Sequence, residues 1–167
     1  MPETLAEEHK NENRIVSAWL LYYHDRKKDY ERRREVILQS SSASRISEAP
    51  GHASVSDTTG RKGDKLAELA EDAGAWLALI AEVEERLPWK MQIFLRLRRE
   101  FRYARSRGRG RPAWIPHVQR HYAEEVAAVL KRSEEDVWVS RVETFGDWWK
   151  MIIEYTGRLA GKRGLLP

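Results

Sequence analysis

Apolar residues recur at helical spacing along most of this chain. The clearest run lies between Lys62 and Leu87, where apolar residues are three or four positions apart and acidic residues fill the other faces. The stripe consists of Leu66, Leu69, Ala70, Ala73, Trp76, Leu77, Ile80, Val83 and Leu87. This period predicts one long amphipathic helix. Pro88 ends that helix and can open the next one at its first position.

A second helical pattern precedes the long helix. From Arg14 to about Leu38 the apolar positions are Ile15, Trp19, Tyr22, Tyr30 and Ile37. Arg26 and Arg33 interrupt the same face, so the stripe is weaker here. Residues 39–60 are rich in Ser, Thr, Gly and Ala and have no apolar period, which predicts a loop or linker.

Three shorter helices are predicted after Pro88, at residues 88–105, 116–131 and 140–156. Ser140 and Glu143 have the spacing of a capping box, in which each side chain bonds to the backbone N–H of the other residue. Gly157 is expected to stop the last helix, and the tail from Ala160 to Pro167 is expected to fray.

These elements predict an all-α fold, with N-terminal long helices followed by a C-terminal tri-helical domain that is helix-turn-helix-like. The expected organisation has three parts. Residues 1–60 form an N-terminal helix and a Ser/Gly-rich linker, residues 61–87 form the long connecting helix, and residues 88–160 form the helix-turn-helix-like DNA-binding domain.

Composition favours a cytoplasmic protein. Among 167 residues there is no Cys, which fits a reducing compartment and excludes disulfides and thiolate metal sites. The first residues are polar and acidic, and no window approaches 18 apolar residues, so we expect neither a secretory signal nor a membrane span. The expected location is the cytoplasm of a bacterial or phage-infected cell.

Positive charge is concentrated in one stretch. Residues 90–111 hold nine basic residues and one acidic residue, whereas residues 112–167 hold eight of each. A local excess of this size gives a strong field for phosphates. The stretch ends in Gly108-Arg109-Gly110-Arg111-Pro112, which resembles the core of an AT-hook, and narrow A·T minor grooves attract arginine. The alternative is a flexible basic turn that contacts only phosphates. The candidate DNA-binding residues of this basic stretch are Arg105, Arg107, Arg109 and Arg111.

The last predicted helix offers a second set of candidates. A helix-turn-helix protein places its final helix in the major groove, with N-terminal residues at base edges. Residues off the apolar stripe here include Arg141, Thr144, Asp147 and Lys150. Glu143 and Asp147 would repel phosphates, although Asp147 could accept from a cytosine amine. The competing interpretation is a plain helical bundle with a solvated outer face.

No catalytic or cofactor site is predicted. His117, His121 and Glu125 are one turn apart, a spacing that can hold a metal, but nothing else supports one, and a surface face with two histidines is the better interpretation. The sequence has no P-loop, no G-x-S-x-G and no GxGxxG motif. We therefore expect no enzyme activity, no metal and no cofactor.

Several short motifs together resemble the RinA/ArpU-type phage transcriptional regulators. They are the Ser56–Thr59 run leading into Lys65-Leu66, the helix end Glu85-Arg86-Leu87-Pro88, and Ser140 to Phe145 followed by Trp148 or Trp149. The resemblance implies DNA binding and control of late or morphogenesis genes, through a helix-turn-helix like that of sigma-factor region four. In this chain Val137-Trp138-Val139 intervenes before the last helix, and the Gly-Arg turn is an addition.

The function expected from the sequence is therefore a double-stranded DNA-binding transcriptional regulator of phage or prophage origin. Its N-terminal helices would form a homodimer or contact host RNA polymerase. One alternative is a small-terminase-like DNA-packaging factor. Another is a helical adaptor that binds proteins and no nucleic acid, which would be favoured if acidic residues such as Glu82, Glu84 and Glu85 screened the arginines.

Overall fold

The computed structural model describes residues 5–40, 58–104 and 112–167, and these residues form helices and no strand. The all-α prediction is confirmed. The helices are α1 (Leu5–Leu21), α2 (Tyr23–Gln39), α3 (Thr58–Leu69), the π-helical turn η2 (Ala70–Gly74), α4 (Ala75–Arg86), α5 (Trp89–Glu100), α6 (Trp114–Leu130), α7 (Glu134–Val137) and α8 (Glu143–Lys162).

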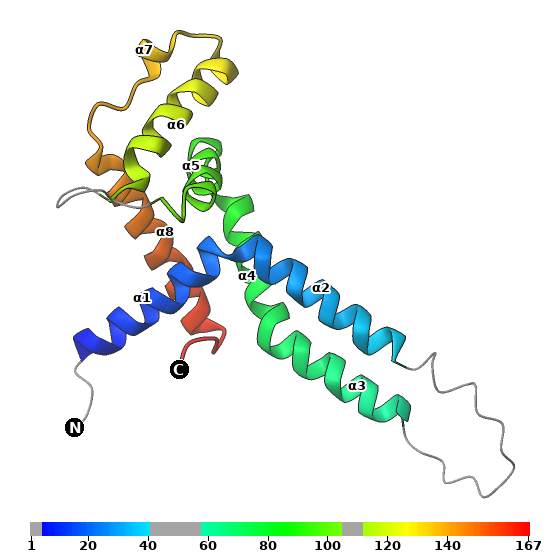
Figure 1. Ribbon diagram of the computed structural model, residues 1–167. Coiled ribbons are helices and arrows are strands. Elements are labelled where there is room, and N and C mark those ends of the chain that lie inside the picture. Colours follow the sequence, from blue (N-terminus) through cyan, green and yellow to red (C-terminus); the bar gives the residue numbers. More distant parts are fainter. Residues whose placement is uncertain (1–4, 41–57, 105–111) are drawn as a thin grey trace, which may run out of the picture. The chain divides into compact units, whose positions relative to one another are not determined.

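The chain divides into two compact units that cut across the three expected parts. The first unit combines residues 1–22 with 79–167, and the second consists of residues 23–78. The N-terminal helix belongs with the C-terminal domain because α1 packs against α8. Figure 1 shows these two helices, blue and orange to red, crossing each other. Because α1 and α8 are far apart in the sequence, no local pattern indicated that they pack against each other.

The central element of the first unit is α5, which contacts α1, α6 and α8. Its Phe94, Leu95 and Leu97 are almost fully buried. Other fully buried side chains come from every large helix of this unit, namely Val16 and Leu20 on α1, Val83 on α4, Val118 on α6, and Phe145 and Ile152 on α8. The first unit therefore has one core, built around α5.

The single helix predicted at residues 14–38 is two helices, separated at Tyr22, and the first of them begins earlier, at Leu5. The two differ in what they bury. Val16 and Leu20 on α1 are fully buried, whereas Tyr23 is the only buried residue of α2. The apolar stripe that holds α1 in the core therefore does not continue past the break.

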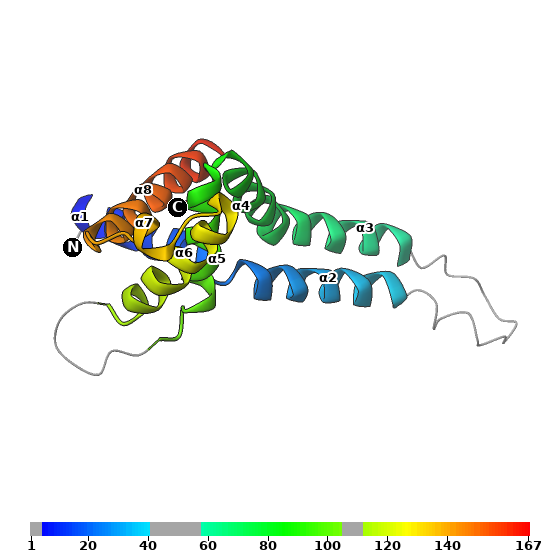
Figure 2. The same ribbon diagram turned by 90° about the horizontal axis from the view of Figure 1, so that it is seen from above.

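The long helix predicted between Lys62 and Leu87 is present as the continuous helical path α3, η2 and α4. The π-helical turn ends at Gly74, where an added Cβ would lie 3.3 Å from the Tyr30 hydroxyl of α2. A small residue therefore lets these two segments of the second unit approach closely. Figures 1 and 2 both show α2 and α3 side by side, and the chain runs in opposite directions along them.

The predicted capping box at Ser140 is wrong. Helix α8 begins at Glu143, and Val142 precedes it with helical dihedral angles and no side-chain cap. The side-chain cap lies one helix earlier, where the Ser133 hydroxyl accepts a hydrogen bond of 3.3 Å from the backbone N–H of Asp136 and starts α7. Trp138, in the connection between α7 and α8, is extended.

The predicted end of the last helix is also wrong, because α8 continues through Gly157 to Lys162. Its end is formed by Gly164, whose φ of 67° lies in the left-handed region. The Gly164 N–H bonds to the Gly161 carbonyl and the Leu165 N–H bonds to the Ala160 carbonyl, which is a Schellman motif. Ala160 is fully buried, so the helix does not fray there.

Candidate nucleic-acid interface

The four arginines at the centre of the predicted interface, Arg105, Arg107, Arg109 and Arg111, lie outside the described residues. The helices on either side of them are well anchored to each other. The Phe101 ring, one residue past α5, stacks on both His117 and His121 of α6, with ring centroids 5.1 Å apart in each pair. At the start of α6, Trp114 lies 6.1 Å from Phe94. The arginine segment 105–111 is thus attached at both ends to a packed helix pair.

Arg98 is buried, so its charge does not add to the field that the basic stretch was expected to provide. Its side chain is 8% exposed. The guanidinium lies over two indoles, 4.4 Å from Trp114 and 5.1 Å from Trp149. Burial lowers the pKa of Arg98 to about 10, because desolvation disfavours the charged form. This arginine is part of the core and cannot reach a phosphate.

Arg99 is buried as well, at 3% exposure. Its Nε donates to the Leu20 carbonyl at the end of α1, at 2.9 Å, and its Nη1 donates to Glu84 Oε2 on α4, at 2.7 Å. Burying a charge is costly unless it is paired and hydrogen-bonded, and Arg99 has both kinds of contact. Arg99 therefore connects three helices of the first unit.

The remaining described arginines of this stretch are also engaged. Exposed Arg96 forms an ion pair with Glu125 on α6. Arg102 is half-buried, and its guanidinium lies 4.6 Å from the Tyr103 ring and 5.7 Å from the Tyr22 ring. The cationic surface that the described residues of this stretch offer to a polyanion is therefore smaller than their number of arginines implied.

One signal in the sequence could have indicated these buried arginines. The apolar residues Ile93, Phe94, Leu95 and Leu97 surround most of the circumference of α5 and form more than a single stripe. A helix that is apolar on most sides lies inside a domain. Charged residues on such a helix must then share the core with their partners.

An aromatic cluster fixes the start of α8. Phe145 lies 5.8 Å from Phe94 on α5 and 5.4 Å from Tyr122 on α6. Trp148 packs at 5.7 Å against each of the same two rings. Burial within this region raises the pKa of the Tyr122 hydroxyl. Both tryptophans of this helix therefore pack within the first unit, Trp148 against the two rings and Trp149 under Arg98.

The residues of the last helix that were predicted to contact bases lie on or near the side of α8 opposite this aromatic cluster. Arg141, Asp147 and Lys150 are exposed, and Thr144 is half-exposed. Arg141 precedes the helix, because α8 starts two residues later. Twelve residues, including α7, separate α6 from α8. The tight turn of a helix-turn-helix therefore does not join these two helices.

The exposed face of α8 carries both signs of charge. In addition to the predicted residues it presents Glu143, Glu154, Arg158 and Lys162. Together with Asp147 and Lys150 on the helix and Arg141 just before it, these residues make four cations and three carboxylates, so this side of the helix has little field of its own. The residues predicted for base contacts thus lie close together, but the mixed charges around them do not create an attractive field for phosphates.

Potential metal ligands do not gather in the described part of the chain. His121 Nδ1 lies 2.9 Å from Glu124, yet no group of three potential metal ligands occurs among the described residues. None of the described helices has the length and apolar character to cross a membrane. An open groove of about 660 Å³ lies between α5 and α6, lined in part by Trp89, Ile93, Val129 and Leu130.

Comparison with known proteins found no match to a family model, to a curated protein or to a solved structure.

Proposed function

We propose that this protein binds double-stranded DNA and regulates transcription. The observation that carries the proposal is the arginine segment 105–111, which has four arginines and no acidic residue and joins two helices that pack firmly on each other. Short segments of this composition bind phosphates or the minor groove of A·T-rich DNA. The link to phage gene control rests on the sequence resemblance alone.

In the proposed complex the two candidate surfaces contact different parts of the DNA. The arginine segment supplies affinity and orientation through phosphates or an adjacent minor groove. The exposed N-terminal part of α8, with Arg141, Thr144, Asp147 and Lys150, supplies whatever base contacts are made. Arg98 and Arg99 contribute to the fold and not to affinity, because they are buried in the first unit.

A salt-titrated binding assay on A·T-rich and mixed duplexes tests the proposal. We expect log K to fall steeply with log salt. Arg109→Ala with Arg111→Ala is expected to reduce that slope by roughly 0.9 for each phosphate that the variant no longer neutralises. Arg141→Ala or Lys150→Ala is expected to change the preference among duplexes more than the slope.

The matched control removes two exposed cations elsewhere, in Lys27→Ala with Lys28→Ala on α2. This variant makes the same change in net charge, so it separates a local contact from a general effect of charge. Equal reductions of affinity in both double variants, or binding that hardly responds to salt, would refute the assignment of the arginine segment.

A protein-binding adaptor is the second candidate, and specific observations favour it. Glu84 neutralises Arg99, and Glu125 pairs with Arg96, so acidic residues do screen part of the basic stretch. In the groove between α5 and α6, Trp89 is 40% exposed and Val129 is 60% exposed. Exposed apolar residues that line one groove are typical of protein contacts. Absence of DNA binding at low salt would favour this function.

A further inference from the structure

The turn that follows α5 presents an aromatic ring to solvent. Tyr103 is 64% exposed, which is the largest exposed fraction of any described tryptophan, tyrosine or phenylalanine. Only two residues separate it from the start of the arginine segment 105–111. A single exposed apolar residue is common on protein surfaces. The groups around the Tyr103 ring therefore decide what it can bind.

Tyr103 belongs to a cluster of two tyrosines and one arginine. The Arg102 guanidinium lies 4.6 Å from the centroid of the Tyr103 ring and 5.7 Å from that of the Tyr22 ring. The two rings are 6.0 Å apart. We call these three residues the tyrosine–arginine platform. Tyr22 and Arg102 are half-buried, so the platform is open to solvent mainly at Tyr103.

Hydrogen bonds and ring contacts hold the platform in place. The bond of 2.9 Å from Arg99 Nε to the Leu20 carbonyl attaches the end of α1, and with it Tyr22, to α5. Arg102 Nη1 donates to the Arg99 carbonyl at 2.8 Å, which orients the guanidinium. The Phe101 ring fixes the same turn to α6 through its two histidine contacts. A ligand that binds here does not have to order these side chains first.

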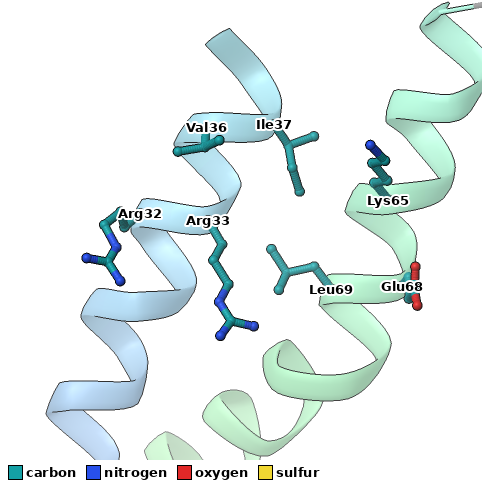
Figure 3. A pocket seen from close by; sticks show the side chains of 7 residues that line it. All are labelled: Arg32, Arg33, Val36, Ile37, Lys65, Glu68 and Leu69. Atoms are coloured by element: carbon teal, nitrogen blue, oxygen red, sulfur yellow. The ribbon is translucent and has the colours of Figure 1, made fainter. Parts of the chain in front are cut away.

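A second surface of the described chain also has arginines beside apolar groups, but it differs in chemistry. This surface is an open groove of about 440 Å³ between α2 and α3. Figure 3 shows Ile37 and Leu69 pointing into the groove, with the Arg33 side chain beside them. Arg32 and Arg33 both form ion pairs with Asp29, and none of the lining residues is aromatic. The groove therefore has no ring on which a planar ligand could stack.

We propose that the tyrosine–arginine platform binds an unpaired base of a single-stranded nucleic acid. Proteins hold single strands by combining a positively charged path for the phosphates with aromatic faces on which bases stack, and arginine adds a cation–π contribution. Tyr103 supplies the face, and the Arg102 guanidinium lies beside it. The arginine segment begins at most about 7 Å further along the chain, a distance of roughly two nucleotides at about 3.4 Å each.

This binding goes beyond the proposed contact with duplex DNA. Bases within a duplex are stacked on each other, and an enzyme or binding protein reaches their faces only after unstacking them. A single strand exposes both its phosphates and its base faces, and so matches the arginine segment and the platform together. A protein partner would have to supply acidic groups for the segment and an apolar contact for the ring.

Fluorescence anisotropy of the full chain with labelled oligo(dT) of about 12 nucleotides tests the proposal. Tyr103→Ala is expected to weaken binding by about five- to hundredfold, the loss that corresponds to one stacked base. Tyr103→Phe is expected to retain the affinity, because it keeps the ring. Thermal unfolding is expected to change little in either variant, since most of the side chain is exposed.

Two controls separate stacking from a general effect on affinity. An abasic oligonucleotide with the same number of phosphates is expected to bind more weakly and to be insensitive to Tyr103→Ala, because it has no base to stack. Trp138→Ala removes another exposed aromatic side chain of the first unit, 46% exposed, and is expected to leave the affinity unchanged. Oligo(rU) is expected to respond to Tyr103→Ala as oligo(dT) does, since stacking does not use the 2′-hydroxyl.

Intact duplexes distinguish this proposal from that of duplex binding. Tyr103→Ala is expected to leave duplex affinity unchanged, whereas Arg109→Ala with Arg111→Ala is expected to weaken the binding of duplexes and single strands alike. Oligo(dT) binding that ignores Tyr103→Ala, or an equal loss with the abasic strand, would overturn the platform even where duplexes bind. Failure to bind any single strand would also overturn it and would favour a protein ligand for the ring. Loss of duplex binding alone would refute only the function proposed above.

Discussion

At the scale of single residues, arginines that are close together in the sequence have different environments and different roles. Arg96 is exposed and paired with Glu125, whereas Arg98, two positions later, is enclosed by two tryptophans. Burial lowers the pKa of Arg98 to about 10 and so disfavours its charged form. Contact with the indole faces and the apolar stem of the side chain compensates. The number of arginines along a helix therefore overestimates the cationic surface.

Replacing each of two glycines near the end of α8 by alanine is expected to change the free energy of unfolding in opposite directions. Gly157 is helical, and an added Cβ would make an ordinary contact of 3.8 Å with Val16 of α1. Gly157→Ala is therefore expected to raise the free energy of unfolding by roughly 0.5–1 kcal/mol. Gly164→Ala is expected to lower it by about 1 kcal/mol, because φ there is positive.

Urea denaturation of both variants measures these effects. Gly146, which has open space around its Cβ position, provides a control for a helical glycine with no neighbour. If Gly157→Ala proved destabilising and Gly164→Ala had no effect, the helix would have to end at Gly157, as the sequence had indicated.

At the scale of elements, helix positions were largely predictable and helix ends were not. The stripes located α3 to α4, α5, α6 and α8, because burial of one face selects their apolar positions. The capping box at Ser140 matched its motif and still was not formed, since the side-chain cap is made by Ser133. A cap depends on where tertiary packing fixes the helix, and four residues of sequence do not specify that.

The contact between α4 and the end of α8 gives a prediction about pH. A hydrogen bond from Arg163 is the main cause that lowers the pKa of Glu82, with further help from the charges of Arg163 and Arg86. Because the folded-state pKa lies below the ordinary 4.5, Glu82 stabilises the fold above that pH, and this stability is lost as the pH falls through the folded-state pKa.

We expect Glu82→Gln to lower the melting temperature at neutral pH and to reduce the decline of stability below pH 4.5. Thermal unfolding across this range measures the effect, with the exposed neighbour in Glu85→Gln as a control. A Glu82→Gln profile parallel to that of the unmodified chain would contradict the role given to this contact.

At the scale of the whole molecule, the two units differ in how much they bury. The first unit encloses Leu95, Val118 and Ile152. In the second, no described side chain from His24 to Ala75 is buried. In a dilute monomer the amides of α2 and α3 are therefore expected to exchange with solvent much faster than those around Leu95 on α5.

Hydrogen exchange followed by mass spectrometry measures this difference. Equal protection of α5 and of the pair α2 and α3 would contradict the expected difference between the two units.

The sequence by itself determined that this protein is helical, where its main amphipathic helices lie, and that its excess of positive charge is concentrated before Pro112. These properties are local, because they follow from the spacing of apolar residues and from the charges within one segment. Only the tertiary structure decided that α1 joins the C-terminal helices, that Arg98 and Arg99 are in the core, and that the start of α8 is fixed by Phe145 and Trp148. Each of these depends on contacts between segments far apart in the sequence, such as the bond from Arg99 to the Leu20 carbonyl, and no local pattern encodes which segments meet.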